Sequence, residues 1–179
     1  NHMLDEIEAQ IRAKIDKYIY STVPGEAYET VIARTVQTLG KRVAILETNT
    51  GNAIAARLQN ALPEGTILAA AYTAFAQETG APPLTLAEAL AAGNDMESAA
   101  RHASEALSAI SGAEINVAVV GTTGADEGVY GKTAGESWVA VSDGKQIIVS
   151  RVPFGGTDDF TAVRIGNQAL RMISDIAVA

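Results

Sequence analysis

Residues 47–52, which read Glu-Thr-Asn-Thr-Gly-Asn, place polar side chains where a strand becomes a helix. The apolar run Val43–Leu46 before them is typical of a buried strand, and Ala53–Leu58 after them is a good helix former. Backbone N–H groups in the first turn of a helix have no partner inside the helix. The turn is therefore suited to an anion or an oxyanion, and a Thr hydroxyl in it is a candidate nucleophile or hydrogen-bond donor.

Thr48 and Thr50 allow two interpretations. Thr commonly caps the helix that follows it, and the turn by itself favours that structural role. In the other interpretation the two hydroxyls and Gly51 form the rim of a pocket, where they bind a ligand or take part in its chemistry. The residues alone leave both interpretations open.

Two further predicted strands end in residues that could join this pocket. The strands cover residues 66–72 and 115–120, and ligands in open α/β sheets bind outside the carboxyl ends of the strands. We therefore expect Tyr72 and Gly121–Thr123 to lie near Thr48. Tyr72 lines the pocket or simply finishes a buried strand, and both possibilities remain open.

The glycine-rich segment 121–135 and one later arginine complete the list of candidates. The segment cradles a phosphate or a ribose, or it is a surface loop, since scattered glycines fit no P-loop or dinucleotide fingerprint. Lys132 is its cation and pairs either with a ligand phosphate or with the neighbouring carboxylates of Asp126 and Glu127. Arg164 reaches the pocket or pairs with an acid at 158–159.

The elements that must position these residues alternate between strand and helix. Hydrophobic periodicity and turn signals predict helices over 4–19, 26–39, 53–61, 85–92, 94–110 and 158–177. They also predict strands over 43–47, 66–72 and 115–120, followed by a hairpin of 137–142 and 146–152 around Asp143 and Gly144. This order predicts an α/β fold, a three-layer α/β/α sandwich with a mixed sheet.

The predicted helix 4–19 carries an apolar stripe that must be buried somewhere. The stripe consists of residues three and four apart, namely Leu4, Ile7, Ile11, Ile15 and Tyr18. It packs on its own domain or docks on a second subunit. We divide the chain into an N-terminal helical extension, 1–24, and one domain, 25–179, and we expect a homo-oligomer, most simply a dimer.

Composition excludes several classes of function. The chain has 179 residues, 47% of them hydrophobic, which fits one globular domain. It lacks cysteine, which rules out thiol catalysis and favours a reducing, cytoplasmic location. The net charge of −8 argues against nucleic-acid and anionic-membrane partners. We expect no metal and no cofactor, and we expect His102 to be structural or exposed.

Several segments resemble one family in the same order along the chain. Residues 47–52 resemble the Glu-Ser-Cys-Thr-Gly-Gly signature of the CinA C-terminal domain family, the nicotinamide mononucleotide amidases. Residues 71–77 resemble its Ala-Tyr-Ser-Asn-Glu-Ala-Lys segment, and 80–83 its Gly-Val-Pro-Pro. Residues 118–124 resemble its Ala-Val-Thr-Gly-Ile-Ala-Gly segment, and 154–156 its Phe-Pro-Gly. The resemblance runs from about Tyr28 to the C-terminus.

The departures from the family bear on catalysis. The resemblance places the nucleophile at Thr48, where the family has Ser, and the activating base at Gln77, where the family has Lys. A Gln side chain has no proton to exchange near neutral pH and cannot replace that base. The resemblance also implies a set of ligand-binding residues, which are Thr50, Gly51, Tyr72, Gly121, Thr122, Thr123, Gly124, Lys132 and Arg164.

The resemblance therefore implies a CinA-family, competence/damage-inducible type of protein with an altered amidase-type pocket. Such a pocket would bind a pyridine-nucleotide-like or other small amide ligand, with deamidase activity weak or lost. One alternative is an active amidohydrolase that uses Thr48 as its nucleophile and the backbone N–H groups of the turn as its oxyanion hole. The other is a structural or regulatory oligomer with a vestigial pocket.

Overall fold

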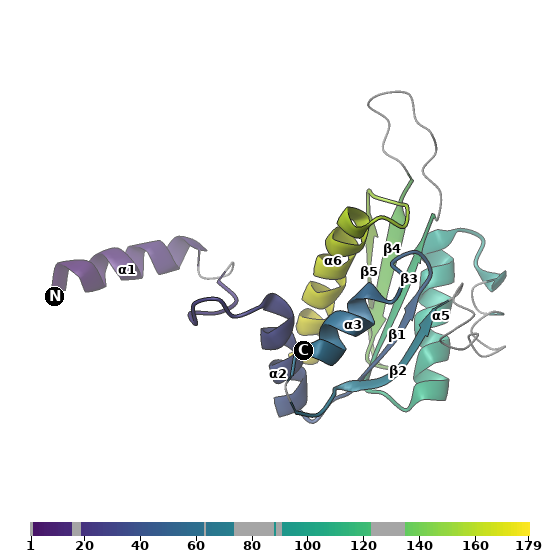
Figure 1. The fold of residues 1–179 in the computed structure, drawn as a ribbon, viewed down its shortest axis with the longest axis horizontal. Helices are drawn as coiled ribbons and strands as arrows, with labels where there is room; N and C mark the ends of the chain where they lie inside the picture. Colours follow the sequence, from purple (N-terminus) through teal and green to yellow (C-terminus); the bar gives the residue numbers. More distant parts are fainter. Residues whose placement is uncertain (1, 16–18, 63, 74–87, 89–90, 123–134) are drawn as a thin grey trace.

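The computed structural model describes residues 2–15, 19–62, 64–73, 88, 91–122 and 135–179 (Figure 1). Its helices are α1 (His2–Ile15), α2 (Tyr28–Thr38), α3 (Ala53–Asn60), α5 (Met96–Ser111) and α6 (Asp159–Ala177). Its strands are β1 (Val43–Glu47), β2 (Leu68–Thr73), β3 (Ile115–Gly121), β4 (Ser137–Ser142) and β5 (Ile147–Val152). Each predicted strand is present, and the predicted hairpin is β4–β5.

The strands form one mixed sheet in the order β2-β1-β3-β4-β5. β1 pairs in parallel with β2 and with β3, whereas β4 and β5 complete the sheet in antiparallel pairing. Figure 1 shows α5 on one face of the sheet and α3 and α6 on the other. The predicted three-layer α/β/α sandwich is confirmed.

Alternating side chains of the central strands build a core on each face of the sheet. Ile45 and Val117 point to the α3 and α6 side, where Ile165 is fully buried. Leu46 points to the opposite side and packs with Leu107 of α5. Because both faces are covered, β1 is buried over its whole length, as its continuous apolar sequence requires.

Several element boundaries differ from the predictions. β2 begins at Leu68 rather than at residue 66, because the Thr66 hydroxyl accepts the Leu68 N–H at 3.0 Å and holds the chain in a turn. α2 begins at Tyr28 rather than at residue 26. The prediction that the first helix reaches residue 19 is wrong, because Ile19 and Tyr20 are not helical and the Tyr20 ring packs edge-on against Tyr28.

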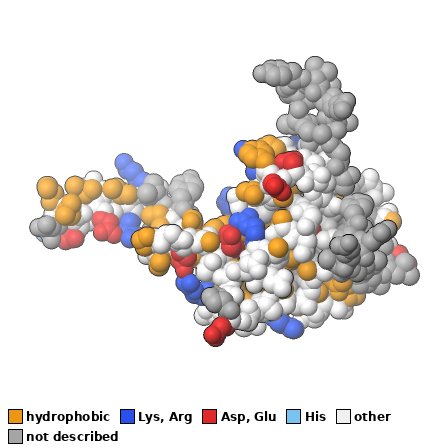
Figure 2. All heavy atoms as spheres, in the orientation of Figure 1, with side chains coloured by type: hydrophobic (Ala, Val, Ile, Leu, Met, Phe, Trp, Pro, Cys, Tyr) orange, Lys and Arg blue, Asp and Glu red, His pale blue; other side chains and the backbone are white. Residues whose placement is uncertain are grey.

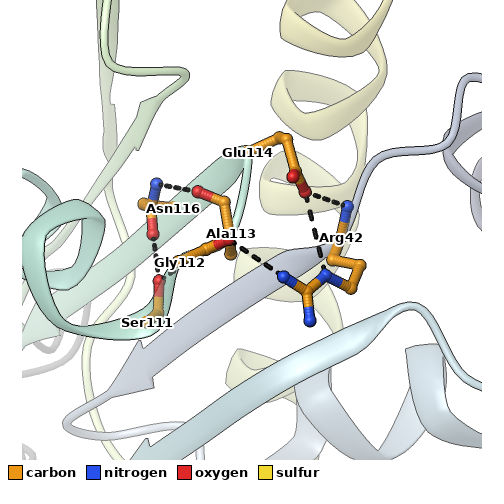
Figure 3. A network of polar contacts seen from close by, with 6 residues as sticks. All are labelled: Arg42, Ser111, Gly112, Ala113, Glu114 and Asn116. Atoms are coloured by element: carbon orange, nitrogen blue, oxygen red, sulfur yellow. Dashed lines mark hydrogen bonds and ion pairs between the residues drawn. The ribbon is translucent and has the colours of Figure 1, made fainter.

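A polar network fixes the amino ends of β1 and β3 (Figure 3). The backbone N–H of Arg42 donates to the Glu114 carboxylate at 2.8 Å, and its guanidinium donates to the Gly112 carbonyl at 3.0 Å. Ser111 donates to the side-chain oxygen of Asn116 at 3.0 Å. These bonds connect the amino ends of the two strands to the end of α5. The candidate site lies at the opposite, carboxyl ends of the strands.

Candidate functional site

The carboxyl ends of β1, β2 and β3 meet at one edge of the sheet, as predicted. Strand pairing sets Glu47 opposite Thr73 on one side and opposite Val119 on the other. The N–H of Thr48 donates to the Val119 carbonyl at 3.0 Å, which extends the ladder one residue past β1. This edge, including the loop that follows β5, is called the strand-end site below.

Glu47 holds the turn that follows β1. Its carboxylate is almost completely buried and accepts the Thr50 hydroxyl, the Ile54 N–H at 3.2 Å and the Ala55 N–H at 3.0 Å. Burial raises the pKa of this carboxyl, and the bonds from Thr50 and the α3 amides partly oppose that rise. The expectation that the first-turn N–H groups of α3 face a ligand is therefore wrong for Ile54 and Ala55.

The same contact decides the structural interpretation of the two threonines. The cap position of α3 belongs to Asn52, whose side chain makes no capping bond, and the Thr50 hydroxyl is directed to Glu47. The prediction that Thr48 or Thr50 caps α3 is wrong, because the Glu47 carboxylate satisfies the helix amides instead. Gly51 is exposed, has a φ of +60° and leaves open space where a Cβ would stand.

Thr48 faces the end of β3. Its Oγ1 accepts the backbone N–H of Gly121 at 3.0 Å, and the residue is 9% exposed. Within the described ranges, no Lys, His, Asp or Glu side chain hydrogen-bonds to this hydroxyl. The hydroxyl is thus held in place but lacks a described base that would turn it into a nucleophile.

Asn49 joins the turn to β4 and to the loop after β5. Its Nδ2 donates to Ser137 Oγ at 3.0 Å and to the Gly156 carbonyl at 3.2 Å, and Ser137 in turn donates to the Phe154 carbonyl at 2.8 Å. A Cβ on Gly121 would lie 2.2 Å from Ser137 Oγ, so only glycine fits there. Among the described residues, the buried Asn49 Oδ1 atom has no hydrogen-bond partner, which is unusual for a buried polar atom.

Thr122 continues this edge toward the loop after β5. Its N–H donates to the Glu136 carbonyl at 3.1 Å, and its carbonyl accepts the Gly156 N–H at 2.8 Å. Its Oγ1 is also buried and has no partner in the part of the chain that the structure describes, and a Cβ on Gly135 would lie 2.0 Å from it. Two buried acceptor oxygens, Asn49 Oδ1 and Thr122 Oγ1, therefore lie at the strand-end site without a hydrogen-bond donor among the described residues.

Tyr72 and Arg164 lie on opposite sides of the sheet. Tyr72 is half-buried and packs in the cluster of Leu46 on the α5 face. Arg164 lies on α6, with its guanidinium 4.5 Å from the ring centroid of Phe154 and 4.3 Å from that of Phe160. The suggested ion pair of Arg164 with an acid at 158–159 is not formed, because Asp158 caps α6 by accepting the Thr161 N–H.

Four predicted site residues, Gln77, Thr123, Gly124 and Lys132, lie outside the described residues. The suggested pairing of Lys132 with Asp126 or Glu127 lies there as well. His102, in α5, is exposed as expected. In the part of the chain that the structure describes, no group of three or more His, Asp or Glu side chains could hold a metal ion. No helix among these residues is long and apolar enough to cross a membrane.

Sequence reasoning included Glu47 and Asn49 in the motif of residues 47–52 but gave neither a role, and it missed Ser137. A signal for Glu47 was present, because an acid that directly follows four apolar residues and precedes a helix start is placed to meet the positive end of that helix. No comparable signal existed for Ser137. Its contact with Asn49 joins positions 88 residues apart, and local periodicity carries no information about such pairs.

Comparison with known proteins agrees with this architecture. Residues 25–177 match the model of the CinA C-terminal domain family. A CinA superfamily protein from Klebsiella pneumoniae 700603 is 25% identical, with a TM-score of 0.68 over 84% of this chain and 96% of its own. The competence damage-inducible protein A from Klebsiella pneumoniae subsp. pneumoniae is 27% identical, with a TM-score of 0.65 over 82% of this chain and 93% of its own.

A more distant structure shares the fold over a longer stretch. A CinA superfamily protein from Escherichia coli is 16% identical, with a TM-score of 0.65 over 93% of this chain and 99% of its own. No curated protein matches the chain. Since the family model matches most of the sequence, this chain belongs to the CinA C-terminal domain family.

Proposed function

We propose that this chain binds a small amide ligand of the pyridine-nucleotide type at the strand-end site and hydrolyses it weakly or not at all. The observation that carries the proposal is that the Thr48 hydroxyl is held in place without a described base beside it. Its hydroxyl is fixed by the Gly121 N–H at 3.0 Å, and no titratable side chain in the described residues bonds to it. The base position implied by the family resemblance is Gln77, which cannot accept a proton near neutral pH.

The polarity of the site supports an amide or a pyridinium rather than an anion at the turn. Glu47 occupies the first-turn amides of α3, the place that a ligand carboxylate or phosphate would otherwise take. The buried Asn49 and Thr122 oxygens have no donor among the described residues, and a carboxamide supplies two N–H donors. The absence of cysteine from the sequence supports a cytoplasmic location for this activity.

A hydrolysis assay tests the catalytic half of the proposal. Nicotinamide mononucleotide is incubated with the protein and released ammonia is measured. Loss of general-base assistance costs about 10²–10⁴-fold in rate, so we expect turnover far below one per second. Turnover of about one per second or faster, in the range of ordinary enzymes, would contradict the proposal and favour an active amidohydrolase.

Calorimetric titration with the same compound tests the binding half. Thr48→Val removes the hydroxyl, and we expect it to weaken binding about 2- to 10-fold, the value of one hydrogen bond. Thr48→Ser keeps the hydroxyl and should bind like the parent. Thr38→Val, at the exposed end of α2, is the control away from the site. Equal affinities for all four proteins would place the ligand elsewhere.

A further inference from the structure

Helix α1 presents an apolar face that its own chain leaves uncovered. Figure 1 shows α1 extending away from the body of the molecule, and Figure 2 shows hydrophobic side chains along one side of it. Met3 is 70% exposed, Leu4 58%, Ile7 46% and Ile11 51%. A lone helix of 14 residues is marginal in water, so this face calls for a partner surface.

A groove on the same chain has the shape and chemistry of such a surface. It is a hollow of about 870 Å³ between α2 and the second half of α6. Tyr28, Val31 and Ile32 form its apolar wall, and Ile19 and Tyr20 close one side. Tyr28 and Arg171 also line a second hollow of about 420 Å³ toward β5. The two hollows adjoin at these side chains and are together called the groove.

The charges of the helix and the groove are complementary at one end. The chain is acidic overall, yet three arginines line the β5 end of the groove, namely Arg151, Arg164 and Arg171. The other end carries Asp175. The first half of α1 is acidic, with Asp5, Glu6 and Glu8, and its last turn is basic, with Arg12 and Lys14. Asp175 pairs with Arg171 at 4.0 Å, and Arg151 pairs with Glu136. A helix whose first half lies at the arginine end therefore meets opposite charge chiefly there, where Arg164 has no acidic partner among the described residues.

We propose that α1 of one copy docks in this groove of a second copy, and that the exchange is reciprocal in a two-fold dimer. Residues 19 and 20, which follow α1 and line the groove, are held on their own subunit. The Tyr20 ring packs on Tyr28 with 5.0 Å between the ring centroids, and the Tyr20 hydroxyl donates to the Glu26 carbonyl. Only three residues separate Ile15 from Ile19. Short connections of this kind favour exchange of an element between protomers over closure within one.

Disulfide trapping tests this arrangement directly, because the chain contains no cysteine of its own. One preparation carries Ile11→Cys in α1 and another, with a different tag, carries Thr35→Cys in the groove. We expect a covalent heterodimer when the two are mixed and oxidised. Ala13→Cys, on the opposite side of α1, is the matched control and should give much less product with Thr35→Cys.

Two outcomes of the trapping experiment would overturn the proposal. If the heterodimer does not form, but a single chain carrying both Ile11→Cys and Thr35→Cys closes internally at high dilution, α1 packs on its own subunit. If Ile11→Cys instead links only to itself, α1 pairs with a second α1 and the groove is not its receptor.

Light scattering gives a second, independent measurement. We expect a dimer for the parent and a twofold lower mass for the double variant Ile7→Asp with Ile11→Asp. The control places the same charges on the opposite, exposed side of the helix as Ala9→Asp with Ala13→Asp, and should remain dimeric. A monomeric parent, or equal masses for the two double variants, would contradict the proposal. Fluorescence of Trp138, in β4, verifies that each variant keeps its fold.

Discussion

Glu47 makes the most specific energetic prediction of the structure. Its two carboxylate oxygens satisfy the Ile54 and Ala55 N–H groups, with the Thr50 hydroxyl as a third donor. In Glu47→Gln one oxygen becomes an NH₂ group, which cannot accept an N–H. One of the two backbone donors is then buried without a partner, at a cost of about 1–3 kcal/mol. Glu47→Ala leaves both N–H groups without a partner, which costs about 2–6 kcal/mol.

The pH dependence of the Gln variant separates the charge from the hydrogen bonds. Burial raises the pKa of Glu47 above its ordinary value of 4.5, so the folded state holds the proton at a pH where the unfolded chain has released it. The contribution of Glu47 to wild-type stability therefore falls as pH rises from 4.5 through the folded pKa. A protonated Glu47 can donate to Thr50 Oγ1 while both its oxygens still accept the backbone N–H groups. A Gln side chain can also donate, but it has only one oxygen that accepts. The deficit of Glu47→Gln is thus largest at low pH and shrinks as pH rises.

Urea unfolding followed by the fluorescence of Trp138 provides the assay. It is run between pH 4.5 and pH 8, and Glu64→Gln, at an exposed loop position, serves as the control. The other acids of the chain affect parent and variants alike and cancel in the difference. If the loss of stability in Glu47→Gln grows with pH, or if Glu47→Ala is as stable as the parent, the Glu47 side chain does not stabilise the start of α3 as described.

Three further predictions follow from individual contacts. Gly121→Ala should lower the free energy of unfolding by about 1–3 kcal/mol, because its Cβ would stand 2.2 Å from Ser137 Oγ; an unchanged urea midpoint would show that the edge yields. Asp95→Ala should cost about 0.5–2 kcal/mol through loss of the capping box of α5, and Asp95→Asn should restore part of it if the cap is responsible. Thr48→Ser with Gln77→Lys should raise trace ammonia release more than either change alone; equal rates would mean that the rest of the pocket has diverged as well.

Local sequence signals were sufficient for the elements that lie within one stretch of chain. The apolar run of β1 predicted a buried strand. The start of α5 predicted Asn94 as the N-cap with Asp95 in an acidic first turn, but the cap is Asp95, one residue later. The hairpin around Gly144, whose φ is +81°, followed from turn chemistry. The order of these elements, together with the family resemblance, was enough for the fold.

The details of the strand-end site depended on contacts that no local pattern encodes. Turn chemistry assigned Thr50 either to a helix cap or to a pocket rim. In the structure the Glu47 carboxylate accepts the α3 N–H groups in place of a capping hydroxyl, and the Thr50 hydroxyl donates to that carboxylate. Asn49 meets Ser137 and Gly156 only because β1, β4 and the loop after β5 converge. The exposed face of α1 was predicted as a stripe, but a stripe does not reveal what covers it.

The most direct test of the proposed function follows ligand binding and amide hydrolysis in one sample. Proton NMR spectra of nicotinamide mononucleotide are recorded with the protein in excess, and the pyridine-ring signals are followed for several hours. The proposed function predicts that these signals shift or broaden on addition of the protein, and that Thr48→Val reduces the perturbation. It also predicts that the amide is lost, if at all, far more slowly than at about one turnover per second. Conversion of the amide to the acid with release of ammonium at about one turnover per second or faster would contradict it, and so would a spectrum that the protein leaves unchanged.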